Sequence, residues 1–228
     1  MRTNKDGPDL VSEHSWDLDE KQAADLQKKL SKKIITQPQV GNVRKIAGVD
    51  AQYERKTDRI HCAVLIFSCP ELTLMEARTS AMKAPYPYIS GFFSFREGPA
   101  VMDCFKKIQN DPDLIFFDGN GVMHPRRFGL ASHLGLLLDR PSIGVAKSWM
   151  LGKFSSPGKQ KGDFSYMTHE GDVIGAAVRT RKKTKPVFVS IGHKASLDYS
   201  VNMTVSFSRY RIPEPIRRAH MYLARFSS

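Results

Sequence analysis

The stretch DLIFFDGNGVMHPRRFGLASHLGLLLD, residues 113–139, decides the fold expected for this chain. Residues 114–117 are all apolar, which is typical of a strand buried on both faces. Asp118 follows directly and precedes a glycine-containing turn, so its carboxylate should lie at the edge of a sheet, where α/β proteins bind ligands. A strand that ends in Asp-Gly can also be no more than a turn capped by Asp118, and this stretch alone leaves both interpretations open.

The second half of the stretch predicts a helix. Pro125 suits the first helical turn, and Arg126 and Arg127 are then expected near the helix start, beside Asp118. The apolar face of this helix consists of Leu130, Leu134, Leu137 and Leu138. The whole stretch is therefore interpreted as a strand, an acid, a glycine turn and a basic helix.

The sequence before this stretch predicts an antiparallel meander of three strands joined by short turns. A helix is expected at 16–30, followed by strands at 43–53, 60–67 and 72–84. Asp50 falls inside the first strand, where a carboxylate among apolar residues is rare unless it is paired or binds a ligand. Glu97 fits a capping box with Ser94, but Pro99 would then fall inside the helix. We therefore expect the helix to begin near Pro99 and to leave Glu97 at the rim.

The sequence after the stretch predicts a parallel strand, two more strands and two helices. These elements are expected at 142–146, 172–180, 187–191, 197–210 and 216–226. The Gly- and Lys-rich segment 153–163 is expected to be a mobile loop. Three antiparallel strands, a helix and then a parallel strand are the layout of an RNase H-like α/β domain, with a mixed sheet flanked by helices.

Composition restricts the class of protein. The chain has 228 residues, 41% of them hydrophobic, which suits one globular domain over 1–228 with 1–15 as a flexible leader. The formal net charge of +12 favours a polyanionic partner, either nucleic acid or an anionic membrane surface. No run of about 18 apolar residues predicts a membrane span. Three cysteines without a CxxC pair argue for a reducing compartment, the cytoplasm, or the nucleus or nucleolus of a eukaryote.

Three carboxylates, those of Asp50, Glu97 and Asp118, would meet at one edge of such a sheet. Carboxylate clusters bind Mg²⁺ or Mn²⁺, hard ions that prefer oxygen ligands. An ion of this kind neutralises a phosphate and activates water, while the basic charge of the protein holds the nucleic-acid backbone. Lys147 ends the next strand and is expected to contact the scissile phosphate. The residues thus predict a metal-dependent nuclease.

Six motifs in a fixed order carry a resemblance to a known family. They are IAGVDAQY, YPYISGFFSFREGP, DGNGVMHPRRFGLASHLGL, IGVAKS, SIGH and RRAH, and they span most of residues 43–224. Together they resemble the endonuclease V family. The resemblance implies an RNase H-like fold and Mg²⁺-dependent cleavage, with Mn²⁺ as a substitute, at the second phosphodiester bond 3′ to inosine. The products would carry 3′-hydroxyl and 5′-phosphate ends.

The resemblance also implies roles for residues. Asp50 and Asp118 would bind the metal, and Glu97 would complete the acidic cluster directly or through water, with Lys147 and His220 as further active-site residues. Tyr88 matches the aromatic residue of a wedge that fills the gap left by an extruded base. The other residues expected to contact nucleic acid are Gly119, Gly121, His124, Arg126 and Arg127. Ser90, Asn120 and the pair Ala51-Gln52 depart from the residues usual in the family at their positions.

Two alternatives remain open at the level of sequence. One is a structure-specific RNase H-like nuclease that reads flaps, loops or mismatches instead of inosine. The other is a non-catalytic nucleic-acid-binding protein that has kept the fold. The expected partner is DNA, RNA or both, bound by a monomer. His133 and His193 are interpreted as structural, and His14, His61 and His169 as surface residues.

Overall fold

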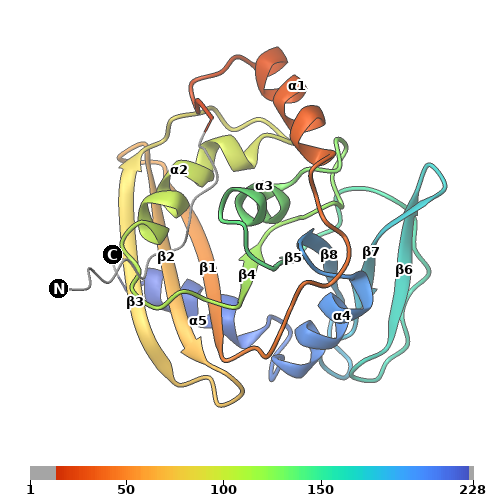
Figure 1. Ribbon diagram of the computed structural model, residues 1–228. Coiled ribbons are helices and arrows are strands. Elements are labelled where there is room, and N and C mark those ends of the chain that lie inside the picture. The colour runs from red at the N-terminus through yellow and green to blue at the C-terminus, as the bar shows by residue number, and fades with distance from the viewer. Residues whose placement is uncertain (1–13, 226–228) are drawn as a thin grey trace.

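The computed structural model describes residues 14–225, and the fold is organised on one mixed sheet (Figure 1). Most of the expected leader lies outside the described residues. The strands are β1 Lys45–Glu54, β2 Arg59–Ser68, β3 Leu74–Lys83, β4 Leu114–Asp118, β5 Ser142–Ala146, β6 Phe164–His169, β7 Asp172–Val178 and β8 Val187–His193. Their order across the sheet is β3-β2-β1-β4-β5-β8-β7-β6. The helices are α1 Glu20–Ser31, α2 Phe93–Phe105, α3 Leu130–Leu137, α4 Leu197–Ser206 and α5 Glu214–Leu223.

The strand directions agree with the RNase H-like layout expected from the sequence. β1, β2 and β3 form the antiparallel meander, and β4 pairs in parallel with both β1 and β5. Val49 of β1 lies opposite Phe117 of β4, so the next residue of each strand, Asp50 and Asp118, ends up at the same edge of the sheet. Two acids that lie 68 positions apart in the sequence are neighbours for this reason.

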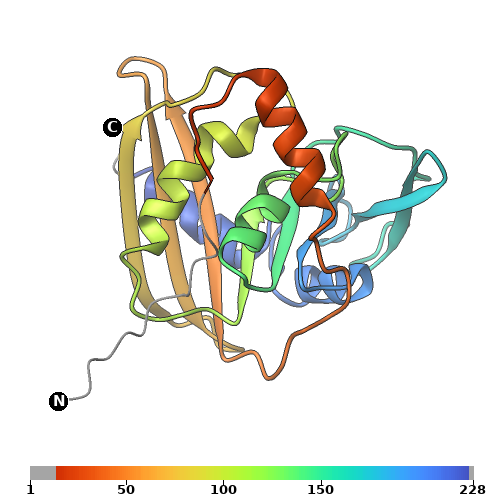
Figure 2. The same ribbon diagram turned by 45° about the horizontal axis from the view of Figure 1, so that its top comes forward.

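Helices cover both faces of the sheet. α2 and α3 pack on one face and α1 lies against them, whereas α4 and α5 pack on the opposite face (Figures 1 and 2). β4 is buried between these layers, because Ile115 and Phe117 face α2 and α3 while Leu114 and Phe116 face α4 and α5. The apolar run of residues 114–117 is thus buried on both faces, as its sequence predicts.

Two expected helix starts were wrong. α3 begins at Leu130, because the backbone before it turns locally: the Arg127 amide donates to the His124 carbonyl over 2.8 Å, and Arg127 has a φ of 53°. Pro125 therefore lies in a loop. α2 begins at Phe93 and contains Pro99, so Glu97 lies inside the helix and no side chain caps its start. Burial of most of this helix outweighs the backbone hydrogen bond that Pro99 cannot make.

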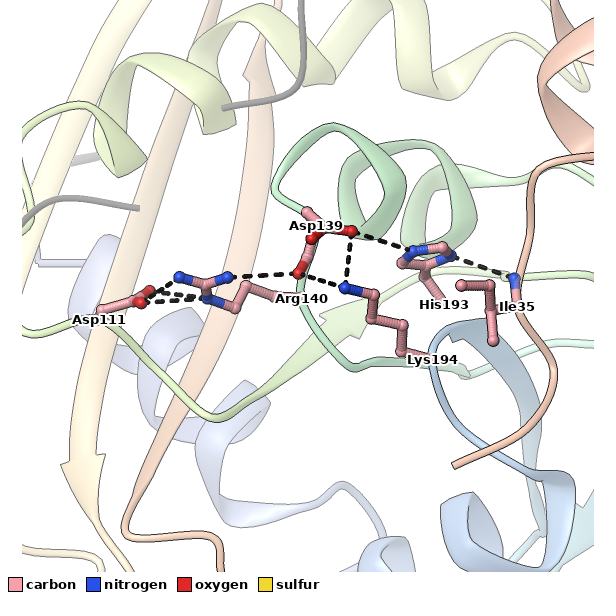
Figure 3. A network of polar contacts seen from close by, with 6 residues as sticks. All are labelled: Ile35, Asp111, Asp139, Arg140, His193 and Lys194. Carbon is pink, nitrogen blue, oxygen red and sulfur yellow. Dashed lines mark hydrogen bonds and ion pairs between the residues drawn. The ribbon is translucent and has the colours of Figure 1, made fainter. Parts of the chain in front are cut away.

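A polar network fastens the segment after α1 to the edge of the sheet opposite Asp118 (Figure 3). His193 is 1% exposed, and its Nδ1 accepts the Ile35 amide over 3.3 Å. Lys194 Nζ lies 2.7 Å from Asp139 Oδ1, and Arg140 pairs with Asp111. His193 is a structural residue, as expected. His14, expected at the surface, is half-buried with its Nε2 2.6 Å from Nε2 of the fully buried His133.

Strand β6 and the three cysteines are two further features of the fold. Strand β6 was not expected from the sequence. The loop before it and the next two strands, β7 and β8, were expected. Cys62 and Cys104 are buried and Cys69 is half-buried, and all three are free thiols. Within residues 14–225, every helix is too short or too polar to cross a membrane.

Candidate active site

Asp50 and Asp118 form the centre of the site. Asp118 ends β4, and Asp50 lies within the adjacent parallel strand β1, level with that end. Asp50 is only 4% exposed, and burial raises the pKa of its carboxyl, although a hydrogen bond from Gln52 opposes this effect. Glu97 belongs to α2, which packs over the same edge. Burial, followed by the negative charges of Asp118 and Asp50, raises the pKa of Glu97 to about 8. The three expected acids thus interact electrostatically.

Cationic and polar side chains already contact two of these acids. Lys147 Nζ lies 2.5 Å from Asp118 Oδ2 and is 44% exposed, so its ammonium lies at the surface of the site. His220 of α5 places Nδ1 3.2 Å from Asp50 Oδ2. Within the described part of the chain, no three His, Cys, Asp or Glu side chains form a group arranged to hold a metal ion. The carboxylates of Asp50, Glu97 and Asp118 interact electrostatically, but they do not form a complete set of metal ligands.

Gln52 is a site residue that the sequence marked only as a departure from the family pattern, without a role. Its Nε2 donates to Asp50 Oδ2 over 2.8 Å and lies 3.0 Å from His220 Nδ1. Since side chains two residues apart on a strand share a face, the position of Gln52 relative to Asp50 was the one available signal. Its contact with His220, 168 residues away, leaves no local trace in the sequence.

A cavity of about 530 Å³ opens beside the acids. Glu97, Asp118 and Lys147 line one part of it, and Tyr88 and His124 are also in its wall. Tyr88 is 72% exposed and its ring meets the edge of the Phe93 ring. This volume is within the range of small-ligand sites, and the cavity joins the acids to an exposed aromatic ring.

Buried hydrogen bonds behind the cavity hold the loop that carries Tyr88. The Gly91 carbonyl accepts hydrogen bonds from His124 Nε2 at 3.0 Å, from Arg126 Nη2 at 2.8 Å and from Gln27 Nε2 at 3.1 Å. Burial lowers the pKa of His124 to about 4, so its ring is neutral at pH 7. Arg126 also donates to Gln27 Oε1, and it therefore supports the loop instead of lying beside Asp118 as expected.

Two more of the expected nucleic-acid contacts lie outside the cavity. Arg127 binds the His169 carbonyl and Asp172 on the β6–β7 hairpin. Gly121 lies against β8, where its amide donates to Ser190 Oγ and a Cβ atom would be 1.9 Å from the Ile191 carbonyl oxygen. The contacts of Arg127 hold the β6–β7 hairpin in place. The close approach to the Ile191 carbonyl explains why only glycine fits at position 121. Gly119 does line the cavity.

Asn120 presents the cavity with a polar group. It lines the wall, and its Nδ2 lies 3.5 Å from Met150 Sδ. Its Oδ1 is buried and accepts no hydrogen bond from the described residues. A buried acceptor without a donor is costly, and a rotation of the side chain that brought this oxygen to the cavity wall would let it accept from a ligand.

Comparison with known proteins agrees with this geometry. The family model of endonuclease V matches residues 28–221. An endonuclease V from Dictyoglomus turgidum is 46% identical over 201 residues, which are 88% of this chain and 87% of the relative. The crystal structure of endonuclease V from Streptomyces avermitilis has a TM-score of 0.88 and 35% identity, covering 93% of this chain and 94% of that one.

A third similar structure includes nucleic acid. It is endonuclease V from Ciona intestinalis in complex with DNA that contains an inosine followed by a ribo-adenosine. It has a TM-score of 0.80 and 29% identity, covering 92% of this chain and 98% of that one. The match to the family model covers most of the chain, including Asp50, Glu97, Asp118, Lys147 and His220. The chain belongs to the endonuclease V family of nucleases, which are hydrolases acting on ester bonds.

Proposed function

We propose that this chain is a metal-dependent endonuclease that cleaves nucleic acid at the second phosphodiester bond 3′ to inosine. Cleavage would leave 3′-hydroxyl and 5′-phosphate ends. The supporting observation is that Tyr88 and Asn120 share one cavity with Glu97, Asp118 and Lys147. An extruded base can enter this cavity while its backbone reaches the acids. The similar Ciona protein, crystallised with DNA containing inosine, supports the same substrate.

Tyr88 and Asn120 are proposed to select the base. Extrusion of a base costs a few kcal/mol, and an aromatic ring stacked in the gap returns about 1–3 kcal/mol. The exposed ring of Tyr88 is suited to that position. Asn120 Oδ1 would accept the N1–H of hypoxanthine, whereas adenine has an acceptor at N1 and would leave two acceptors facing each other.

The donor set of the site fits a divalent cation such as Mg²⁺, with Mn²⁺ as a substitute. Carboxylate oxygens are the ligands these ions prefer. Burial and mutual repulsion raise the pKa values of Asp50 and Glu97, and a nearby divalent charge would relieve that repulsion. Asp50 and Asp118 would hold the ion, with Glu97 acting directly or through water. The bound ion would neutralise the phosphate and activate water.

The remaining site residues have roles of their own. Lys147 Nζ is partly exposed beside Asp118 and would donate to an oxygen of the scissile phosphate. His220 and Gln52 orient Asp50 through their contacts with Oδ2. His124, through the Gly91 carbonyl, keeps the loop of Tyr88 in place. Arg126 donates a hydrogen bond to the same Gly91 carbonyl. Arg127 forms an ion pair with Asp172 of the β6–β7 hairpin.

The wider setting of the activity is also a proposal. We expect one domain over residues 1–228 that acts as a monomer on DNA, RNA or both. The free cysteines suit a reducing compartment, so we expect the cytoplasm, or the nucleus or nucleolus in a eukaryote. The net charge of +12 supports a polyanionic substrate.

The test is cleavage of matched DNA and RNA strands that differ only in carrying inosine or adenosine, each with Mg²⁺ and with EDTA. We expect cutting of the inosine strand in Mg²⁺ alone, and loss of cutting in Asp118→Asn and Asp50→Asn with substrate binding retained. Equal cutting of an undamaged hairpin would favour a structure-specific nuclease. Binding without cutting by the parent chain would favour a non-catalytic protein.

A separate variant tests the base pocket. Tyr88→Ala should reduce the preference for inosine over adenosine by about tenfold or more, because stacking of one base is worth about 1–3 kcal/mol. Cleavage of both strands would fall by the same factor if Tyr88 served only to hold the loop. Phe164→Ala, which removes an exposed aromatic side chain from β6, is the matched control and should leave the preference unchanged.

A further inference from the structure

Three arginines surround one exposed tyrosine between α4 and α5. The guanidinium carbons of Arg217, Arg181 and Arg209 lie 4.7, 5.7 and 6.0 Å from the centre of the Tyr210 ring. Tyr210 is 41% exposed, and Arg181 and Arg209 are also exposed. We call these four residues the Tyr210 cluster.

The charge of this cluster is only partly balanced. Glu214 pairs with Arg217 over 2.9 Å, and it also pairs with Arg218. In the part of the chain that the structure describes, no carboxylate forms an ion pair with Arg181 or Arg209. Like charges held together repel each other, and a ligand that carries several negative charges removes this repulsion. Guanidinium groups around an aromatic ring suit the phosphates and bases of a nucleic-acid strand.

The cluster is connected to the active site in two ways. Arg211, the residue after Tyr210, donates from Nη2 to the carbonyl of Lys147 over 2.5 Å. Arg217 and His220 lie three residues apart on α5 and therefore share one side of that helix. His220 in turn contacts Asp50. Arg217 of the cluster thus lies about one helical turn from His220, the residue that contacts Asp50.

The arrangement of layers determines which part of a substrate can reach this surface. The cavity lies on the side of the acids that is covered by α2. The Tyr210 cluster instead includes Arg217 of α5, which packs on the opposite face of the sheet (Figure 2). The acids lie at the edge of the sheet between these faces. A strand whose base occupies the cavity has to cross this edge at the acids before it reaches α5.

We infer that the Tyr210 cluster binds the backbone of the substrate strand on the 3′ side of the cut. The inference rests on the proposed function, in which the cleaved bond is 3′ to the base in the cavity. The nucleotide beyond the cut then leaves the acids toward His220, Arg217 and Tyr210. The residues of this cluster do not line the cavity, and the cluster extends the proposed footprint from the acids to the start of α5.

The test removes the two unpaired charges and changes the length of the substrate. The variant is Arg181→Gln/Arg209→Gln, and both positions are exposed outside helices and strands. The control, Lys106→Gln/Lys107→Gln, removes two charges directly after α2, where the Lys107 carbonyl accepts a hydrogen bond from Arg78 of β3. Each protein is titrated in EDTA with an inosine strand that has either a long 3′ arm or an arm that stops just after the cutting position.

We expect the arginine variant to bind the long-armed strand about tenfold more weakly than the parent, and to bind the short-armed strand like the parent. Its salt slope on the long-armed strand should fall by about 1.4, which is about 0.7 for each lost contact with a single strand. The lysine control should match the parent on both strands. Equal weakening on both strands, weakening that follows the 5′ arm, or no weakening would each overturn the inference.

Failure of the proposed function gives a different result. It is measured on the parent chain, as absence of a preference for the inosine strand over its adenosine counterpart in Mg²⁺. If the parent shows this preference and the arginine variant binds long-armed and short-armed strands as the parent does, the proposed function stands and the inference about the Tyr210 cluster fails.

Discussion

Gln52 shows how a single amide can control an acidic site. Its Nε2 donates to Asp50 Oδ2 over 2.8 Å, and this hydrogen bond favours the ionised carboxylate against the burial that disfavours it. Removal of the amide should raise the pKa of Asp50 and leave less carboxylate at a given pH. His220 Nδ1 lies 3.2 Å from the same oxygen, but the donor role of Gln52 is fixed because an amide nitrogen can only donate.

We therefore predict that Gln52→Ala lowers kcat for the inosine strand by about tenfold at neutral pH, since a hydrogen bond to a charged group is worth about 1.5–3 kcal/mol. The acidic limb of the pH–rate profile should move to higher pH. Steady-state cleavage from pH 5.5 to pH 9 measures both effects. Gln39→Ala, at an exposed position, is the control. A profile identical to that of the parent would remove Gln52 from the site.

His124 makes folding stability depend on pH. The Arg126 amide donates to Nδ1 over 3.2 Å and Nε2 faces the Gly91 carbonyl, so both nitrogens are engaged by a neutral ring. Its pKa is lowered from 6.5 to about 4, mainly by burial. The unfolded chain therefore takes up this proton at higher pH than the folded chain. The stabilisation is complete above pH 6.5 and is lost as the pH falls toward 4.

The expected loss from this one histidine between pH 7.5 and pH 5 is about 2 kcal/mol of unfolding free energy. Urea denaturation at the two pH values measures it. His124→Gln can still donate to Gly91 but does not titrate in this range, so its stability should fall by about 2 kcal/mol less than that of the parent. A variant with the full pH dependence of the parent would show that folding does not shift the pKa of His124.

At the scale of elements, α1 is attached to the cavity through Gln27. This side chain is fully buried, and it donates to the carbonyls of Gly91 and Phe128 while accepting from Arg126 Nε over 2.5 Å. One residue thus joins α1, the loop of Tyr88 and the loop before α3. Loss of its amide would leave buried donors and acceptors without partners, which costs about 1–3 kcal/mol for each group.

We predict that Gln27→Leu lowers the unfolding free energy by about 3 kcal/mol, as measured by chemical denaturation. Lys29→Leu places the same side chain at an exposed position of α1 and should change stability by no more than about 0.5 kcal/mol. If both variants were equally stable, the network behind the cavity would contribute nothing to the fold.

The elements also show what a sequence can and cannot reveal. β1 and β4 were predictable because their apolar residues alternate or run without a break, and their pairing brings Asp50 and Asp118 together. The start of α2 was not predictable, because Pro99 indicates a helix start and only tertiary burial keeps it within the helix. β6 has exposed aromatic residues and little apolar alternation. Gln27 and Gln52 act through contacts between distant segments, which leave no periodic pattern.

At the scale of the whole molecule, charge and recognition are separate properties. The net charge of +12 would act on any phosphate backbone, whereas the proposed base pocket would act on one base. These two contributions should therefore respond differently to salt. Release of counterions from the backbone depends on the salt concentration, but stacking and hydrogen bonding within the cavity do not release counterions.

We predict that the affinity for duplex DNA falls with salt at a slope of log K against log salt near −5, if about six phosphates are contacted at about −0.9 each. Fluorescence anisotropy from low to moderate salt, in EDTA, measures this slope for inosine and adenosine duplexes. Both should give the same slope and differ only in their intercept. Tyr88→Ala should reduce that difference in intercept and leave the slope unchanged, because it removes a ring and no charge. A slope near zero would contradict binding through the backbone, and a slope altered by Tyr88→Ala would show that charge and base recognition are coupled.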